Sequence, residues 1–365
     1  MSSGFPRISK LAALLGDFEV GAFLAWSPVT MGYLHGFHEH AGERLMLLAI
    51  RPNGDVRFIG PALSESQARR SGMKDVHVWD DSSDPMSLVR SLVKDWSLEN
   101  TRLAVDDEMP AQLLLRLQAG IPDAKFECAQ PILGTLMRNK EPEELELLLK
   151  AAEIADQVWD EVAAKLRPGI TERAIAKWLT SGMTDRGAEP YFAIVAAGAN
   201  GAEPHHLSDS TPLQRGDVVI LDFGCDLNGY KSDITRTVAI QTASSKAHEV
   251  YSVVHQAHMA ARAAIVPGAT GADIDKAARD VVEAAGYGPK FFHRTGHGIG
   301  LRGHEDPYIV SSNQQIILPG DCFSVEPGIY LEGEFGVRIE NIVTATPSGY
   351  RSLNAEPTVE IMVVS

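Results

Sequence analysis

Residues 217–240, DVVILDFGCDLNGYKSDITRTVAI, decide the fold of the larger part of this chain. The dipeptide Asn-Gly at 228–229 is a strong signal for a two-residue β-turn, because both residues of such a turn need a positive φ. Apolar runs lie on both sides of it, so the stretch predicts an antiparallel hairpin. Pairing that is symmetric about the turn then places Asp222 opposite Thr235.

Two aspartates of this hairpin are predicted to share one face. Side chains alternate between the two faces along a strand, so Asp222 and Asp233 become diagonal neighbours, roughly 7–8 Å apart at the backbone. Asp222 directly follows the apolar run VVIL, which predicts a buried strand, and a buried acid needs a partner. The simpler alternative is a pair of surface aspartates. The same alternation turns Cys225 away from them.

A second hairpin repeats this arrangement with glutamates. The segments 323–330 (FSVEPGIY) and 336–343 (GVRIENIV) flank a short turn centred on Gly333. Symmetric pairing places Glu326 directly opposite Glu340, although a β-bulge at the glycines would shift this pairing by one residue. Two like charges in direct opposition destabilise a sheet. A metal ion between them resolves the conflict, so the second hairpin also predicts a metal site.

A glycine-rich segment supplies histidines. Residues 291–307, FFHRTGHGIGLRGHEDP, contain His293, His297 and His304, and glycines let the backbone approach a site closely. Carboxylates with one imidazole suit hard or borderline divalent ions, so manganese, cobalt, zinc and iron all fit. Four carboxylates balance the charge of two such ions, which favours a two-metal centre over a one-metal centre.

The whole chain predicts two domains. Strand-like and helix-like stretches alternate up to about residue 135, which is typical of an α/β domain with a mostly parallel sheet. Apolar residues then recur at helical spacing from Leu145 to Leu166, which predicts a long helix. We therefore expect a smaller N-terminal α/β domain at 1–137 and a catalytic domain at 138–365.

The second domain is expected to be α+β. Helices are predicted at 171–186, 246–266 and 271–285. Between them lie strand candidates that are joined by short turns, including the two hairpins. Short turns indicate antiparallel pairing, because parallel strands need a long crossover connection.

Charge and cysteine content restrict the partners. The formal net charge of −15 argues against nucleic acid or an anionic membrane as the main partner, although solubility alone also explains such a charge. The sequence shows no run of about 18 apolar residues and no targeting segment, so no membrane association is expected. The three cysteines are isolated and lack CxxC spacing, which suits a reducing cytoplasm.

These motifs resemble those of the creatinase/methionine aminopeptidase superfamily, whose catalytic domain has the pita-bread fold. The chain is most similar to the Xaa-Pro dipeptidases (prolidases) and to aminopeptidase P, and the likeness covers the whole chain. The resemblance implies two divalent ions, with Asp233 and Glu340 bridging them. The five ligands fall on Asp222 (ILDFG), Asp233 (SDITRT), His297 (TGHGIG), Glu326 (VEPGIY) and Glu340 (RIEN).

The resemblance also implies a reaction. A water activated by the ions attacks the carbonyl carbon before proline, with Glu326 as the proton shuttle and manganese as the first choice of metal. His205, His293 and His304 match histidines that bind the substrate or stabilise the tetrahedral oxyanion. Arg338 matches the arginine of prolyl-specific members. The implied substrate is a proline-containing dipeptide or short peptide, and a homodimer is expected.

Two features leave questions open. Several prolidases place an arginine four residues after the second flanking histidine to hold the dipeptide carboxylate, and here that position is Tyr308. The sequence therefore leaves the choice between dipeptides and longer peptides open. In the segment 35–44, His35, His38 and His40 either reach an active site from a neighbouring subunit or lie in a solvated loop.

Three rival functions remain as alternatives. A metal-free C–N hydrolase like creatinase has the same fold, but such relatives lack the full ligand set. Other metal-bearing relatives act on ectoine derivatives or on a sulfonium compound, so a non-peptide small molecule is an alternative substrate. The third is an inactive binding scaffold, against which the intact ligands argue. His255 and His258, on one predicted helix, are interpreted as structural or solvent-facing, and His206 is assigned no role.

Overall fold

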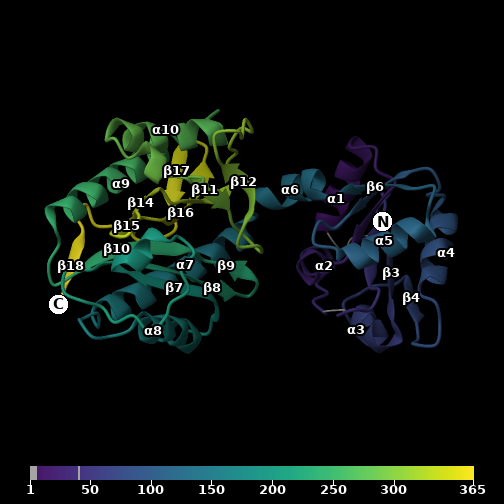
Figure 1. Ribbon diagram of the computed structural model, residues 1–365. Coiled ribbons are helices and arrows are strands. Elements are labelled where there is room, and N and C mark those ends of the chain that lie inside the picture. Colours follow the sequence, from purple (N-terminus) through teal and green to yellow (C-terminus); the bar gives the residue numbers. More distant parts are fainter. Residues whose placement is uncertain (1–5, 40–41) are drawn as a thin grey trace. The chain divides into compact units, whose positions relative to one another are not determined.

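A computed structural model describes residues 6–39 and 42–365 of the chain (Figure 1). The chain divides into two units between Met137 and Arg138, and each unit has its own hydrophobic core. Within the described ranges, no helix is both long enough and apolar enough to cross a membrane.

The first unit is built on a six-stranded sheet with the order β4-β3-β2-β1-β5-β6. The strands are β1 (Ala22–Ala25), β2 (Leu47–Ile50), β3 (Val56–Pro61), β4 (Val76–Trp79), β5 (Arg102–Val105) and β6 (Lys125–Cys128). The helices are α1 (Pro6–Asp17), α2 (Pro28–His35), α3 (Glu65–Arg70), α4 (Met86–Trp96), α5 (Ala111–Gly120) and α6 (Gln130–Arg138). The apolar side of α4, with Val89, Leu92 and Trp96 at helical spacing, packs into the core of this sheet.

This sheet is mostly parallel, as the sequence predicts, except that β2 runs opposite to both of its neighbours. Strands β1, β5 and β6 are mutually parallel, as are β3 and β4, but β1-β2 and β2-β3 are antiparallel. The loop 51–55 between β2 and β3 is too short for the crossover that a parallel pair requires. Strands β4 and β6 escape prediction because their side chains are only partly buried and form no continuous apolar run.

The second unit is α+β, as predicted, with two five-stranded sheets covered by two pairs of helices and a further two-stranded sheet (Figure 1). The helices are α7 (Pro142–Ala163), α8 (Glu172–Asp185), α9 (Ser245–Ala263) and α10 (Gly271–Ala284). The strands are β7 (Glu189–Ala197), β8 (Val218–Leu227), β9 (Tyr230–Lys231), β10 (Ile234–Ile240), β11 (Gly296–Gly298), β12 (Glu305–Ile309), β13 (Cys322–Val325), β14 (Gly328–Leu331), β15 (Phe335–Arg338), β16 (Asn341–Thr346), β17 (Gly349–Ser352) and β18 (Met362–Val364).

Each sheet has its own pair of helices. The first sheet has the order β18-β10-β8-β7, with β9 paired to β8, and packs its apolar side chains against α7 and α8. The second has the order β12-β11-β13-β16-β17 and packs against α9 and α10. Helix α7 starts at a capping box formed by Glu141 and Glu144, with Pro142 in its first turn. The two hairpins that carry the polar residues are part of these sheets: β8 and β10 lie in the first, and β13 and β16 lie in the second.

The first hairpin forms with the predicted register. Asn228 and Gly229 both have a positive φ, 53° and 92°, as the two-residue turn requires. Asp222 lies opposite Thr235. Cys225 is buried in the core on the other side, with its Sγ 3.5 Å from a carbonyl oxygen of α7. The chemistry of the turn therefore determines the face on which Asp222 is presented.

The second hairpin has the predicted symmetry about Gly333, but the predicted direct pairing of its glutamates is wrong. Strand β14 pairs with β15 and β13 pairs with β16 in this symmetric register. Between the two ladders, the N–H of Glu326 donates to the carbonyl oxygen of Thr295 (2.8 Å), and the N–H of Glu340 donates to that of Thr235 (3.2 Å). The proline after Glu326 has no N–H with which to continue the ladder. Each glutamate is therefore bound to a different neighbouring strand.

Helix α9 contains a fully buried histidine. His258 is 0% exposed, and neither of its ring nitrogens has a hydrogen-bond partner in the described part of the chain. Burial first, and then the charges of Arg262, Arg236 and His255, lower the pKa of His258 well below its usual 6.5. His258 is therefore a core residue, whereas His255 is half-buried.

We predict that His258 makes the folded protein sensitive to acid. Below about pH 6.5 the unfolded chain takes up a proton at this residue and the folded chain does not. The free energy of unfolding therefore falls by about 1.4 kcal/mol for each pH unit below that value. His258→Leu should remove this contribution. The measurement is the fall in melting temperature between about pH 7.5 and about pH 5.5, which should be smaller in the variant.

The exposed His248 of the same helix provides the control. His248→Leu should keep the pH dependence of the wild type. If His258→Leu and the wild type lost the same stability on acidification, the prediction would be wrong.

Candidate metal centre

All nine residues that the sequence nominates for the site line one cavity of the second unit, with a volume of about 1100 Å³. They come from the two hairpins, from the glycine-rich segment and from the loop that precedes β8. The nine are Asp222, Asp233, His297, Glu326, Glu340, His205, His293, His304 and Arg338. Segments that lie far apart in the chain therefore meet at one place.

Asp233, His297 and Glu340 form the centre of this cluster. Each offers one ligand atom, and the three atoms lie within 4.8 Å of one another. The Nε2 of His297 is 3.3 Å from the Oε1 of Glu326 and 3.8 Å from the Oδ2 of Asp233. The Nδ1 of His297 is 3.1 Å from the carbonyl oxygen of Gly298. With a proton on Nδ1 donated to that carbonyl, the lone pair on Nε2 is available to a metal.

Three of the carboxylates have a buried oxygen that receives no hydrogen bond within the described residues: Oδ1 of Asp222, Oδ1 of Asp233 and Oε1 of Glu340. The other oxygen of Asp222 accepts from Arg338 (2.7 Å), and that of Glu340 accepts from the hydroxyl of Thr235 (2.7 Å). Buried acceptors are nearly always satisfied. Oxygens of this kind are the ligands that hard divalent cations prefer, so the residues present fit bound metal ions.

The carboxylates concentrate negative charge where water cannot stabilise it. Burial, followed by the neighbouring carboxylates, raises the pKa of Asp233 and of Glu340 well above the usual range. Burial also raises the pKa of Glu326 to about 7. The pKa of His297 is lowered to about 3, mainly by burial, so its imidazole is neutral and able to bind a metal. Two divalent cations would offset the charge of four carboxylates and keep them ionised.

Arg338 connects the centre to Tyr330 and His293. Its guanidinium donates to Asp222 (2.7 Å), to the hydroxyl of Thr235 (3.1 Å) and to the Oη of Tyr330 (2.9 Å). The Nε2 of His293 lies 2.9 Å from the same Oη, and its Nδ1 lies 2.7 Å from a backbone carbonyl oxygen. With the proton on Nδ1, the tyrosine hydroxyl donates to Nε2. The sequence does not single out Tyr330, although alternation along FSVEPGIY indicates its face.

A buried glutamate on α8 holds the loop that carries His205. Glu172 is 0% exposed, and its Oε1 accepts from the N–H of Ala197 (2.8 Å) and the Nδ2 of Asn200 (2.9 Å). Its Oε2 lies 2.8 Å from the Nε2 of His206. His206 therefore anchors the loop, while its neighbour His205 lines the cavity. Glu172 is far from the motifs in sequence, and no motif reveals it.

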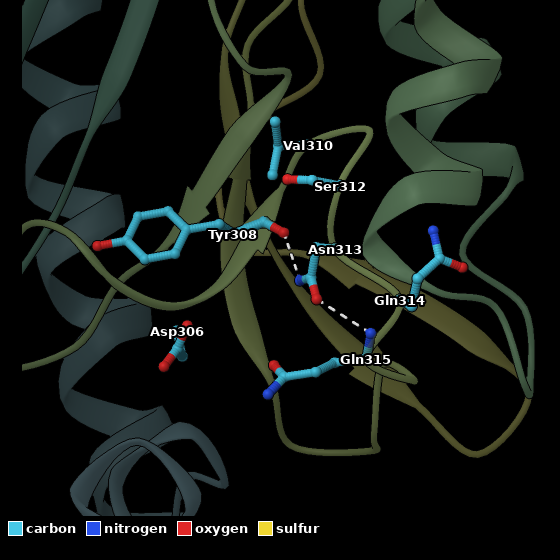
Figure 2. Close-up of a pocket in the computed structure, with 7 residues that line it drawn as sticks. All are labelled: Asp306, Tyr308, Val310, Ser312, Asn313, Gln314 and Gln315. Carbon is cyan, nitrogen blue, oxygen red and sulfur yellow. Dashed lines mark hydrogen bonds between the residues drawn. The ribbon is translucent and has the colours of Figure 1, made fainter. Parts of the chain in front are cut away.

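Arg294 connects His304 to the strand that carries Tyr308. Its Nη2 lies 3.0 Å from the Nδ1 of His304, and its guanidinium carbon lies 4.7 Å from the centre of the Tyr308 ring. The rings of His304 and His297 lie against each other, with centres 3.8 Å apart and planes tilted by 39°. Tyr308 and Asn313 both line a second cavity, with a volume of about 600 Å³. The Nδ2 of Asn313 donates to the carbonyl oxygen of Tyr308 (2.6 Å), and Figure 2 shows the Tyr308 ring extending away from Asn313.

The histidines of the segment 35–44 belong to the first unit. His35 is buried at the end of α2, and His38 is exposed. His40 lies outside the described residues. A role for this segment in the site therefore stays a prediction.

Known proteins resemble the chain along its whole length. The model of metallopeptidase family M24 matches residues 146–347, and that of the creatinase/prolidase N-terminal domain matches residues 7–136. A probable dipeptidase PepE of Mycobacterium tuberculosis is 37% identical over 365 residues, which is 98% of this chain and 96% of that protein. A Xaa-Pro dipeptidase of Lactobacillus helveticus is 34% identical, covering 95% of this chain and 96% of its own.

A solved structure supports the same relationship. The crystal structure of a prolidase from Thermococcus sibiricus superimposes with a TM-score of 0.92 at 32% identity, and the match covers 98% of both chains. The predicted fold, a pita-bread catalytic domain with a smaller N-terminal α/β domain, is thereby confirmed.

We predict that Asp233→Asn separates charge repulsion from metal binding. In metal-free protein the variant removes a buried charge that neighbouring carboxylates repel, so its melting temperature should equal or exceed that of the wild type. Manganese at 100 times its Kd should stabilise the wild type by at least about 2.7 kcal/mol and the variant far less. Thermal unfolding with a chelator and then with manganese measures both effects.

The exposed Asp280 on α10 offers a matched control. Asp280→Asn should respond to manganese as the wild type does. An Asp233→Asn variant that manganese stabilised as strongly as the wild type would show that this carboxylate is no ligand.

Proposed function

This chain belongs to metallopeptidase family M24, and we propose that it is a dinuclear-metal peptidase that hydrolyses Xaa-Pro bonds at the N-terminus of dipeptides or short peptides. The observation that carries the proposal is the set of three buried carboxylate oxygens that receive no hydrogen bond from the described residues, on Asp222, Asp233 and Glu340. Asp233 and Glu340 also cluster with His297. The Xaa-Pro specificity is supported by relatives named Xaa-Pro dipeptidase and prolidase.

In this proposal the metal ligands are Asp222, Asp233, His297, Glu326 and Glu340. Two divalent ions held there would supply a Lewis acid for the scissile carbonyl and a water of lowered pKa. An Xaa-Pro bond is a tertiary amide, and it has no N–H for an ordinary peptidase to bind. A site that works on the carbonyl side of the bond therefore suits this substrate.

Glu326 is proposed as the proton carrier. The hydroxyl of Ser324 donates to its Oε1 (3.1 Å), which fixes the orientation of the carboxylate. Glu326 takes a proton from the attacking water and delivers it to the proline nitrogen, which then leaves as an amine. The carboxylate is regenerated, so the protons of the reaction balance.

The remaining polar residues are proposed to bind the substrate and to orient the centre. His205, His293 and His304 line the cavity, and they hold the substrate or stabilise the developing oxyanion. Arg338 is 4% exposed and donates to Asp222, so its contribution is to orient that ligand. Such support shells are typical of metal sites.

The proposal also covers the metal, the domain bounds, the oligomeric state and the cellular location. We expect manganese as the metal, with cobalt, zinc or iron as alternatives, since oxygen ligands predominate. The N-terminal domain is placed at 1–137 and the catalytic domain at 138–365, which agrees with family matches at 7–136 and 146–347. A homodimer is expected from the resemblance. A cytoplasmic location is supported by three cysteines that are all free.

The direct test is hydrolysis of Ala-Pro beside a longer peptide that begins with Xaa-Pro, with added manganese or zinc. We predict release of free alanine from at least one of them, and loss of this activity on chelation. Asp233→Ala should reduce kcat/KM by at least about 10³-fold, because a lost ligand disrupts the centre on which chemistry depends. The amine released is measured over time.

The control is Asp280→Ala, which truncates an exposed aspartate and should retain wild-type rates. If the metal-loaded protein cleaved neither peptide, the Xaa-Pro function would be rejected. The alternative hypothesis, that a non-peptide small molecule is the substrate of the same centre, would then gain support.

A further inference from the structure

Helix α10 carries two ion pairs of the same spacing in different surroundings. Lys276 and Asp280 pair at 2.6 Å on the exposed face of the helix. Asp275 and Arg279 pair at 2.7 Å, but Asp275 is 0% exposed and the side chain of Arg279 is only 26% exposed. An ion pair at the surface contributes little to stability. A fully buried carboxylate is costly unless its oxygens are bonded, so the position of the inner pair depends on the partners that it finds.

The further hydrogen bonds of this inner pair go to the glycine-rich segment. The Oδ1 of Asp275 accepts from the N–H (3.2 Å) and from the hydroxyl (2.7 Å) of Thr295. Arg279 donates through Nη1 to the carbonyl oxygen of Phe291 (3.0 Å) and through Nη2 to that of His293 (2.5 Å). Its guanidinium carbon also lies 4.4 Å from the centre of the Phe291 ring. The pair therefore binds three alternate residues of this segment.

The segment that is bound in this way presents His293 to the cavity. The Nδ1 of His293 lies 2.7 Å from the carbonyl oxygen of Arg294, and its Nε2 lies 2.9 Å from the Oη of Tyr330. Arg338 donates to the same Oη (2.9 Å), so the ring of His293 ends a chain of hydrogen bonds that starts at the metal centre. Because Arg279 binds the backbone of His293 itself, a displaced guanidinium would move this ring.

The shape of a guanidinium suits this task. Nε and Nη2 of Arg279 donate to the two oxygens of Asp275, at 2.7 and 3.1 Å. Nη1 and a second N–H of Nη2 remain for the two carbonyl oxygens of the segment. These donors are fixed in one plane, whereas the ammonium of a lysine is a single point of charge on a flexible stem. No other side chain can therefore hold the carboxylate and both carbonyls in one geometry.

Resting on the proposed Xaa-Pro activity, we propose that Arg279 is a positioning residue, which fixes the backbone of His293 so that its imidazole meets the substrate in one orientation. Asp275 holds the guanidinium in place for this task. Arg279 does not line the cavity itself, so its effect on catalysis passes through His293. The simpler alternative is that the inner pair only attaches α10 to the domain, in which case it affects stability alone.

The test is a double-mutant cycle on the manganese-loaded full chain, with Ala-Pro as the substrate. Arg279→Gln should lower kcat/KM by about 10- to 100-fold, because a small misplacement of a substrate-binding group costs this much. The double variant Arg279→Gln/His293→Ala should lie within about 3-fold of His293→Ala alone, since the arginine then has no imidazole left to position. Arg279→Lys should be intermediate, because it keeps the pairing with Asp275 and loses the hold on both carbonyls.

The exposed pair of the same helix provides the control. Lys276→Gln breaks that pair and should keep the wild-type kcat/KM. Melting temperature and bound manganese are measured for every variant, so that activity refers to folded, metal-loaded chain. If the losses in Arg279→Gln and His293→Ala multiplied, or if the first disappeared on this basis, the proposal would be overturned. Should Arg279→Gln be too unstable to measure, Arg279→Lys enters the same cycle in its place.

A measurement without substrate separates this inference from the proposed function. In protein with isotope-labelled histidine, nuclear magnetic resonance reports the ring nitrogens, and the His293 signal is the one that His293→Ala removes. The signal should show one tautomer, protonated at Nδ1, in the wild type and in Lys276→Gln, and it should shift or broaden in Arg279→Gln. An unchanged signal in Arg279→Gln would overturn the proposal. If the wild type does not cleave Ala-Pro, the proposed function fails, and this signal alone decides whether Arg279 positions His293.

Discussion

Four carboxylates, two buried and two half-buried, surround one imidazole, and the rest of the site depends on this constraint. Burial and mutual repulsion oppose the ionised forms of Asp233 and Glu340, whose pKa values are raised well above the usual range. The nearby charge of Arg338 is already paired with Asp222. In the proposed function divalent cations supply the compensation, and the neutral imidazole of His297 is the proposed nitrogen ligand.

The fold keeps these groups together by giving each a second attachment. The hydroxyls of Thr235 and Ser324 hold Glu340 and Glu326, and the ladders on either side are interrupted at the two glutamates so that their backbones bond to other strands. These two proposed ligands are therefore held in place by the protein itself, which lowers the cost of ordering them. Outside the metal cluster, Glu172 holds the loop of His205 in the same way, through Ala197 at the start of the loop and His206 within it.

The features that local chemistry determines could be predicted from the sequence. The Asn-Gly turn requires two positive φ values, so the register that places Asp222 on the site face follows from two residues. The features that depend on packing between remote segments could not. Glu326 and Glu340 leave their ladder because other strands offer partners, and Glu172 and Arg294 acquire their roles only through tertiary contacts.

The cluster is proposed to hold two divalent ions. Counting bound metal in the purified full chain, after complete removal of metal and reconstitution with manganese, tests this claim most directly. Elemental analysis of the dialysed protein, together with a calorimetric titration, gives the number of ions per chain. We expect two ions per chain, bound tightly enough to survive dialysis. A value of one or less would contradict the account, because one ion cannot offset four carboxylates.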